Sequence, residues 1–507
     1  MQNKLHVSLR DVRIPAAIIS FFLSAWSVFL DDVLNNDGIL YVRVADLLVH
    51  GEWDIAFNLY KWPFYSLLIA VTGQVTGFSL EYSAHLLNAV LAALIVVCFI
   101  SLIREVGGDS KTVLAAAFVV LLYPGINEYR SFIGRDAGYL AFYLLSLLLF
   151  FKYANSPRFG YAIGWASSIF IAALFRIEGF LFLLILPLLY QWRKVTTLPA
   201  RLMLIITMIG ACLFLSLMMA WWFSGITLGL GADKILHTLA LSYQSLWQDI
   251  SAHVSAKTLV IGEQFLTKYS REHAFAVYIA AIGAILLAEI FARLTPLYAF
   301  LTGHAIYRRL IFPVDDIKYF WTWLVFLNLA ILGVFVVVML FLTGRFPLAL
   351  SLTLMLAVPF SMVALYEKWR ENRSGQRTKN WLFPVVCAVF LISGVEGLYS
   401  PTTKGHLREA GVWLKENTPA KSSLFSNDLI VMFYSGRKAS PNEAVYGWQR
   451  TRGLISSERW SNYDYLAFRI KRADKEQETF LLKALNKNPT AKFANRKGDK
   501  VLVFKVH

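Results

Sequence analysis

The stretch "IPAAIISFFLSAWSVFLDDVLNNDGILYVRVADLLVHGEW" (14–53) joins a long apolar run directly to a group of acidic residues. The run at 14–30 contains no charged residue and is long enough to enter, as a helix, a hydrocarbon layer about 30 Å thick. Asp31, Asp32 and Asp37 follow at once. Carboxylates this close to hydrocarbon are costly unless they are paired or functional. The stretch therefore predicts a membrane helix whose outer end carries a functional site or, alternatively, a simple acidic outside loop.

The composition is that of a polytopic membrane protein. Of 507 residues, 57% are hydrophobic and only 16% are charged, whereas soluble domains have about 45–50% apolar and about 25% charged residues. The net charge of +16 is expected in cytoplasmic loops and at lipid headgroups. The sequence contains no RNA- or DNA-binding motif, so nucleic acid is not a predicted partner. Cys98, Cys212 and Cys387 lie inside apolar runs and lack metal or disulfide spacing, which predicts packing roles.

The apolar runs predict about eleven membrane helices. These are expected at 14–30, 82–103, 112–124, 137–151, 159–175, 179–190, 201–223, 274–292, 319–343, 346–366 and 381–398. No small-residue cleavage site follows the first run, which predicts a retained helix and not a signal peptide. With the basic N-terminus inside, the dense basic clusters fall in cytoplasmic loops. The run at 62–78 would reverse this pattern if it crossed, so it is predicted to lie at the interface or re-enter the membrane.

The composition changes near residue 400, which predicts a membrane domain over 1–399 and a small outer α/β domain over 400–507. The expected elements are a helix before the turn at Asn417–Pro419, a strand containing Val431 and Phe433, a helix at about 474–486, and a final strand, "KVLVFKV". The domain has about 20 Lys and Arg against about 10 Asp and Glu. Such a basic domain would dock anionic lipid or glycan, or would simply be a solvated surface.

The stretch "NDGILYVRVADLLVHGEW" (36–53) also matches an ordered family pattern. It resembles the first outer loop of GT-C fold glycosyltransferases that use polyprenyl-phosphate sugars, the family of aminoarabinose transferases and protein O-mannosyltransferases. The matching positions are Asp37, Tyr41, Ala45, Gly51 and Trp53. The family then has a Lys-x-Pro segment that leads into a short juxtamembrane helix, and Lys61, Pro63 and Tyr65 match it.

The resemblance continues in order along most of the chain. "YRSFIGRDAGYLAFYLL" (129–145) supplies Arg135 and Asp136, at the position where the family has an acid at the start of a helix. "ALFRIEGFLFLLILPLL" (173–189) is similar to the family's Arg-x-Glu-Gly segment and supplies Arg176 and Glu178. "TGRFPLALSLTLMLAVPF" (343–360) resembles a late segment and supplies Arg345. The segment at 410–437 resembles the outer domain that follows the last helix.

The resemblance implies transfer of a sugar from polyprenyl phosphate to an acceptor oxygen. Asp37 is then the expected base, and Asp136 would share this task, orient the acceptor or hold a metal. Cations stabilise the charge that develops on a departing phosphate. The expected substrate-binding residues are Lys61, Tyr41, Arg135, Arg176, Glu178, Arg345 and Tyr65. For each arginine, snorkelling to the membrane interface is the alternative.

Two departures from the family pattern leave metal dependence open. Gly38 follows Asp37 where an acid pair is common, and Tyr60 stands where some relatives have an acid before the lysine. Both changes remove possible ligands of a divalent cation. Additional carboxylate and imidazole groups occur at His237, His253, Glu263, Glu272 and His273, but their scattered spacing favours ordinary polar roles.

The expected protein is therefore an inverting GT-C type glycosyltransferase of the bacterial inner membrane, with its C-terminal domain in the periplasm. The acceptor would be a lipid, a glycan or a protein. A transporter or flippase for a lipid-linked glycan is one alternative, although transporters commonly show internal repeats and no convincing repeat is found. An inactive GT-C-like assembly partner is another, because of the Asp37–Gly38 departure.

Overall fold

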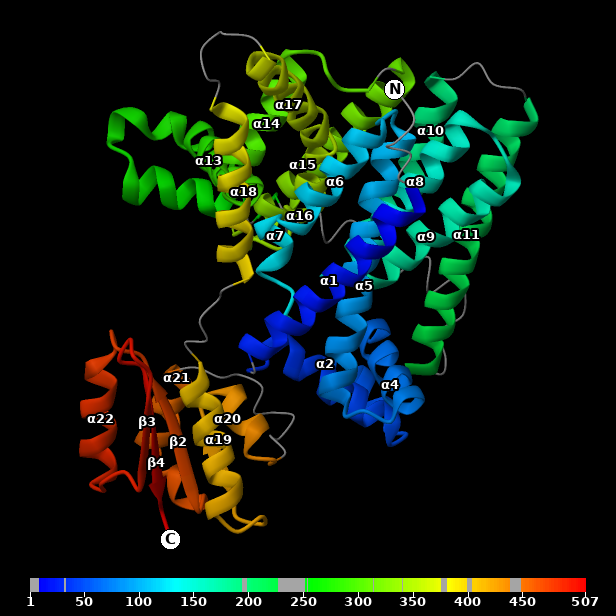
Figure 1. Ribbon diagram of the computed structural model, residues 1–507. Coiled ribbons are helices and arrows are strands. Elements are labelled where there is room, and N and C mark those ends of the chain that lie inside the picture. The colour runs from blue at the N-terminus through cyan, green and yellow to red at the C-terminus, as the bar shows by residue number, and fades with distance from the viewer. Residues whose placement is uncertain are drawn as a thin grey trace. The chain divides into compact units, whose positions relative to one another are not determined.

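The computed structural model describes residues 9–31, 33–193, 198–226, 251–252, 254–312, 314–339, 341–374, 381–398, 404–437 and 448–507. Asp32, His237 and His253 lie outside the described residues. The described chain is mainly helical with a small mixed sheet near its C-terminus, which confirms the predicted fold class at that level (Figure 1). It divides into two compact units. The first comprises Met1–Leu23, Ala89–Tyr129 and Arg135–Leu398, and the second comprises Ser24–Asn88, Arg130–Gly134 and Tyr399–His507.

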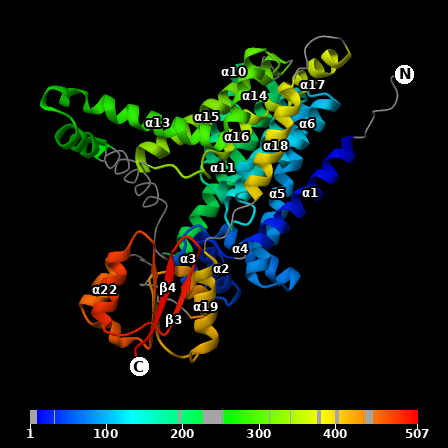
Figure 2. The ribbon, with the colours of Figure 1, turned by 60° about the vertical axis from the view of Figure 1, so that its left-hand side comes forward.

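The first unit is a bundle of apolar helices (Figures 1 and 2). Its elements are α6 (Ser110–Leu121), α7 (Pro124–Asn127), α8 (Asp136–Asn155), α9 (Phe159–Phe175), α10 (Gly179–Arg193), α11 (Leu198–Ile226), η1 (Ile261–Phe265), η2 (Lys268–His273), α13 (Ala274–Leu294), α14 (Pro296–Tyr307), α15 (Asp315–Met339), α16 (Leu348–Met355), α17 (Val358–Ser374) and α18 (Leu382–Leu398). Two further helices, α1 (Leu9–Leu30) and α5 (Leu80–Glu105), contribute to both units. The most extensive contact joins α8 to α9, and α9 also packs against α10 and α11.

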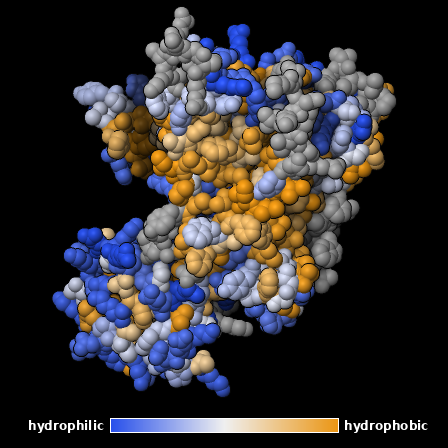
Figure 3. All heavy atoms as spheres, in the orientation of Figure 1, coloured by the Kyte–Doolittle hydropathy of each residue, from blue (hydrophilic) through white to orange (hydrophobic). Residues whose placement is uncertain are grey.

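Six helices in the described part of the chain are long and apolar enough to cross a membrane. They span Val12–Leu30, Leu80–Glu105, Asp136–Asn155, Lys268–Leu294, Asp315–Val337 and Leu348–Glu371. A broad apolar area lies on the visible surface over the helices of the first unit, whereas the C-terminal elements show mostly hydrophilic side chains (Figure 3). The protein is a multi-pass membrane protein. Shorter apolar helices accompany the six long ones, and the number of eleven spans stays a prediction.

Beyond small differences in their bounds, the helices are divided differently from the predicted spans at two places. The predicted span at 346–366 is divided into α16 and α17 by a turn at Leu356 and Ala357. Pro359 explains the break, because proline has no N–H to donate to the carbonyl of Met355 and its ring collides with that carbonyl in a continuous helix. In addition, α14 was not predicted. It begins directly after Thr295, whose positive φ of 60° ends α13.

The second unit contains three short helices from the first outer loop: α2 (Asn36–Val49), α3 (Trp53–Leu59) and α4 (Phe64–Thr76). Both α3 and α4 pack against α2. Helix α4 has 13 residues, and at 1.5 Å per residue it is about 20 Å long. That length is less than the thickness of the hydrocarbon layer, about 30 Å. The interfacial position of the run at 62–78 stays a prediction, but its helix is too short to cross.

The second unit also contains the C-terminal α/β elements. They are α19 (Gly405–Asn417), β1 (Leu424–Ser426), α20 (Leu429–Tyr434), α21 (Trp448–Ser456), η4 (Arg459–Asn462), β2 (Tyr465–Ile470), α22 (Lys475–Leu485), β3 (Ala491–Ala494) and β4 (Lys500–Lys505). The sheet has the order β1-β2-β4-β3, with β1 parallel to β2 and the other pairs antiparallel. Its apolar core includes Leu466, Phe468, Leu481 and Leu502. The expected helix at 474–486 and the final strand are present as α22 and β4.

The predicted strand containing Val431 and Phe433 is wrong, because these residues lie in helix α20. The Asp428 side chain accepts hydrogen bonds from the backbone N–H groups of Ile430 at 2.9 Å and Val431 at 3.4 Å. An aspartate in this N-cap position satisfies the first N–H groups of a helix and favours its start. The cap therefore outweighs the strand preference of the branched and aromatic residues that follow.

Candidate active site

Two helix ends bring opposite charges together in the first unit. Asp136 is the first residue of α8, and Arg176 follows the last residue of α9. A carboxylate is stabilised at a helix N-terminus and a guanidinium at a helix C-terminus by the helix dipole. Because α8 packs along α9, the sequence places both favoured charges at neighbouring helix ends.

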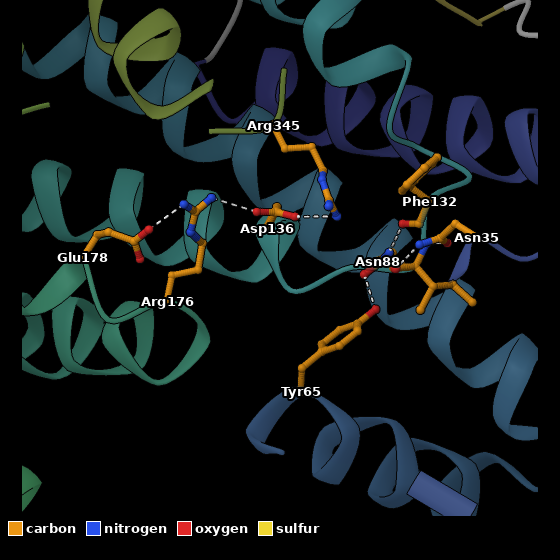
Figure 4. A network of polar contacts seen from close by, with 9 residues as sticks. Asn35, Tyr65, Asn88, Phe132, Asp136, Arg176, Glu178 and Arg345 are labelled. Atoms are coloured by element: carbon orange, nitrogen blue, oxygen red, sulfur yellow. Dashed lines mark hydrogen bonds and ion pairs between the residues drawn. The ribbon is translucent and has the colours of Figure 1, made fainter. Parts of the chain in front are cut away.

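These charges form a chain of ion pairs (Figure 4). Arg176 donates from Nη1 to Oδ1 of Asp136 at 2.8 Å and from Nη2 to Oε1 of Glu178 at 2.5 Å. Arg345 donates from Nη1 to Oδ2 of Asp136 at 3.5 Å. The side chain of Arg176 is only 7% exposed, whereas that of Arg345 is 25% exposed. Arg176 is thus a buried centre of the network, and Arg345 is its more accessible cation.

Gly138 permits the close approach of the two helix ends. A Cβ atom at this position of α8 would lie 2.2 Å from Cε1 of the Phe175 ring, which is far shorter than a van der Waals contact. Phe175 immediately precedes Arg176. The missing side chain at Gly138 therefore lets the end of α9 pack against the first turn of α8, within hydrogen-bonding distance of Asp136.

Two aromatic rings enclose the guanidinium of Arg176. Its Cζ atom lies 4.5 Å from the ring centroid of Phe346 and 5.2 Å from that of Tyr139. Cation–π attraction is stronger when the cation is desolvated. The rings also limit the rotamers of the side chain, so that the two carboxylates meet a fixed cation.

The electrostatic environment keeps the network charged. Burial disfavours the charged form of Arg176, but the carboxylates of Asp136 and Glu178 raise its pKa above the ordinary value. Burial would raise the pKa of Glu178, yet the charge and hydrogen bond of Arg176, with a smaller effect of Arg135, hold this pKa below its ordinary value. Arg135, the residue before α8, therefore acts on the same cluster through its charge.

A second ion pair near this network was not predicted from the sequence. Arg293, at the end of α13, donates from Nη1 to Oε2 of Glu128 at 2.5 Å. Its guanidinium lies 5.9 Å from the ring centroid of Tyr129. The pKa of Tyr129 is raised, mainly by burial, while the charges of Arg293 and Arg345 oppose the increase. The only sequence signal for Arg293 was its position as a charged residue at the end of an apolar run.

The remaining predicted residues belong to the second unit. Asp37, the second residue of α2, is half-buried. Tyr41 follows one turn later, and its ring centroid lies 5.1 Å from that of Tyr65 and 5.5 Å from that of Tyr60. Lys61 is exposed in the connection between α3 and α4.

The structure thus joins Asp136, Arg176, Glu178 and Arg345 in the first unit, and Tyr41 with Tyr65 in the second. The predicted convergence of both groups in one cavity stays a prediction.

No group of three or more His, Cys, Asp or Glu side chains among the described residues is arranged to hold a metal ion. Each carboxylate oxygen of Asp136 accepts a hydrogen bond from an arginine. Glu272 lies 3.6 Å from the neighbouring His273, and both side chains are exposed.

No protein-family model and no curated protein sequence matches the chain. Among solved structures, the chain is similar to archaeal oligosaccharyltransferase AglB from Archaeoglobus fulgidus, in complex with an inhibitory peptide and a dolichol-phosphate. This match has a TM-score of 0.50 and 13% identity, and covers 91% of this chain and 69% of AglB.

Two further solved structures resemble the chain. The apo oligosaccharyltransferase of Archaeoglobus fulgidus has a TM-score of 0.46 and 15% identity, over 82% of this chain and 59% of that one. ArnT from Cupriavidus metallidurans, bound to undecaprenyl phosphate, has a TM-score of 0.38 and 11% identity, over 97% of each chain. The chain is structurally similar to GT-C fold glycosyltransferases, and the predicted fold resemblance is confirmed.

Proposed function

We propose that this protein transfers a sugar from a polyprenyl-phosphate donor to a lipid, glycan or protein acceptor at the outer face of the membrane. The observation that carries the proposal is the pairing of Arg176 and Arg345 with the single carboxylate of Asp136, in a chain with a GT-C-like fold. This arrangement holds two cations at fixed positions near the ends of apolar helices, as a lipid-linked anionic donor requires.

Arg345 is the proposed contact for the phosphate of the donor. Negative charge builds on the phosphate oxygens as the bond to the sugar breaks, and a fixed cation in a site of low dielectric stabilises that charge more than water does. Arg345 is more exposed than Arg176 and is held by Asp136 at a longer distance, 3.5 Å against 2.8 Å. It can therefore approach a ligand, while Arg176 keeps Asp136 in place.

The geometry favours an orienting role for Asp136. Both of its oxygens accept hydrogen bonds from guanidinium groups, so its carboxylate is engaged in fixing Arg176 and Arg345. The base that removes the acceptor proton is then Asp37, as the sequence resemblance implies. Lys61, which is exposed, is proposed to supply a further positive charge for the donor phosphate.

The test is sugar transfer by the full-length protein, purified in detergent, with a panel of polyprenyl-phosphate-linked sugars and with lipid, glycan and peptide acceptors. The Arg345→Ala variant is expected to lower kcat by about 10²-fold, the usual effect of removing one fixed charge-stabilising group. Asp37→Asn is expected to lower it by about 10²–10⁴-fold, because a positioned base is lost.

Lys111→Ala is the matched control. This change removes an exposed ion pair with Glu367 in the first unit and is expected to leave transfer unchanged. Equal turnover by the wild type, Asp37→Asn and Arg345→Ala would contradict the proposed site. Flipping of a lipid-linked glycan without any transfer would instead support a transporter.

A further inference from the structure

Side-chain amides hold the backbone of Phe132 and Ile133 in the second unit (Figure 4). Asn35 donates from Nδ2 to the carbonyl of Ile133 at 3.0 Å, and its Oδ1 accepts from the N–H of Ile133 at 3.0 Å. Asn88 donates from Nδ2 to the carbonyl of Phe132 at 2.6 Å. We call these three hydrogen bonds the amide clamp.

Asn35 of the amide clamp stands at the N-cap position of α2, with extended backbone angles, but does not cap the helix with its side chain. Asparagine in this position usually accepts a hydrogen bond from one of the next backbone N–H groups. Here both groups of the side-chain amide bind Ile133 instead. The N-terminus of α2 is therefore anchored to a segment almost one hundred residues away in the sequence.

Gly38 is required for this anchoring. A Cβ atom at position 38 would lie 2.8 Å from Oδ1 of Asn35 and 2.9 Å from Cβ of Ile133. Asn35 is 6% exposed and Ile133 is fully buried, so neither has room to move aside. The glycine that departs from the family's acid pair thus has a steric reason in this chain, because any side chain at position 38 would push α2 away from Ile133.

The next turn of α2 is tied to the same clamp. Oδ1 of Asn88 accepts a hydrogen bond from the hydroxyl of Tyr65 at 2.7 Å, and the Tyr65 ring packs edge-on against Tyr41. Asp37 lies between these two fixed points, two residues after Asn35 and four before Tyr41. Its backbone is consequently held on both sides by contacts that are buried.

We propose that Asn35 is a positioning residue, which fixes the first turn of α2 and thereby the carboxylate of Asp37, and that Gly38 provides the space for this. This inference rests on the proposed function, in which Asp37 is the base. Removal of the amide leaves the N–H and C=O groups of Ile133 without these hydrogen bonds in a buried place, which is costly. The α2 N-terminus then shifts to recover partners, and small displacements of a catalytic group reduce its rate strongly.

The test compares Asn35→Ala and Gly38→Ala with Asn36→Ala in the full-length protein. Asn36 is the exposed neighbour in the same helical turn, so its variant removes an identical side chain without touching the clamp. Both clamp variants are expected to lower kcat by about 10-fold to 10²-fold, with the KM for the donor within about twofold of the wild type. Asn36→Ala is expected to behave as the wild type in both constants.

Hydrogen exchange provides a readout that does not depend on activity. The amide of Ile133 is expected to exchange at least about fivefold faster in Asn35→Ala, as loss of one hydrogen bond worth about 1 kcal/mol implies. An unchanged exchange rate would disprove the clamp. The positioning role alone would be overturned if Asn35→Ala speeds exchange of the Ile133 amide but leaves kcat unchanged, while Asp37→Asn inactivates the protein. Absence of transfer by the wild type across the donor panel would overturn the proposed function and, with it, the positioning role.

Discussion

Arg176 donates a hydrogen bond to Asp136 at 2.8 Å, although the two residues are 40 positions apart and belong to different helix ends. The same guanidinium binds Glu178 and lies between the rings of Tyr139 and Phe346. One buried side chain thus links α8, the start of α10 and the segment that carries Arg345.

Replacement of Arg176 by alanine is expected to destabilise the first unit by about 3–5 kcal/mol, because two partly buried carboxylates lose their cation. Arg176→Lys is expected to be destabilising as well, since an ammonium cannot reproduce two directed hydrogen bonds and stacking on two rings. The measurement is the thermal unfolding midpoint in detergent. A midpoint of Arg176→Ala equal to that of the exposed-pair variant Lys111→Ala would contradict a central role for Arg176.

Gly138→Ala is expected to separate the end of α9 from the first turn of α8, because the new methyl group would overlap the Phe175 ring. Overpacking of this kind costs about 1–3 kcal/mol, and sugar transfer should fall as Arg176 moves away from Asp136. Gly160→Ala is the matched control in α9, since a Cβ atom there meets no other group within 4 Å. It should be neutral or stabilising by up to about 1 kcal/mol, and a similar loss in both variants would argue against the close approach.

His406 is expected to make the stability of the C-terminal elements depend on pH. It is buried, and neither ring nitrogen has a hydrogen-bond partner in the described part of the chain. Burial first, and the charge of Arg469 second, lower its pKa below 6.5. The unfolded chain therefore binds this proton at a higher pH than the folded chain does. The stabilisation is complete above pH 6.5 and is lost as the pH falls below that value.

The corresponding measurement is hydrogen exchange in β2 and β4 at pH 5 and pH 7.5, corrected for intrinsic rates. Protection should be lower at pH 5 in the wild type. In His406→Gln, which cannot acquire this charge, the two corrected values should be closer together. An equal pH response of both proteins would assign the effect to another group.

Tyr434→Phe is expected to loosen α20 from the start of α2 within the second unit. The Tyr434 hydroxyl accepts a hydrogen bond from the N–H of Leu34 at 3.2 Å and donates to Glu81 at 3.5 Å. Burial raises the pKa of Tyr434 to about 12, so the hydroxyl keeps its proton at neutral pH. The loss should be about 0.5–1.5 kcal/mol. The measurement is hydrogen exchange of the Leu34 amide, which should be faster in Tyr434→Phe than in the wild type. An unchanged exchange rate would show that the hydroxyl is dispensable.

Most helices of the first unit were predictable because apolar runs are a local signal, although α14 was missed. Pro359 was the only sequence signal for the division of 346–366 into α16 and α17. It was not used, because the residues around it form a continuous apolar run. The strand expected at Val431 and Phe433 became helix α20 because a single cap, Asp428, decides the local structure. Strand β2 was missed because its pairing partner, β4, is about 30 residues away in the sequence. Strand β3 has only four residues, which is too short for a clear alternating pattern.

The candidate site was predictable only as separate pieces. The family resemblance pointed to Asp136, Arg176, Glu178 and Arg345, and the structure joins them. Arg293, Asn35 and Asn88 were missed, because their partners lie 44 to 165 residues away in the sequence. Local periodicity and propensity contain no information about such pairs. The role of Gly38 was not predictable either, because the steric reason for a glycine can be recognised only when the positions of the surrounding atoms are known.

The order of the C-terminal sheet has a consequence for solubility. Its two outermost strands, β1 and β3, have three and four residues, whereas the inner strands β2 and β4 have six each. Strand β3 also has an exposed lysine, Lys492. Short edge strands, and a lysine on one of them, offer a poor template for strand addition by another chain. Neighbouring copies crowded on one bilayer are therefore discouraged from merging their sheets into aggregates.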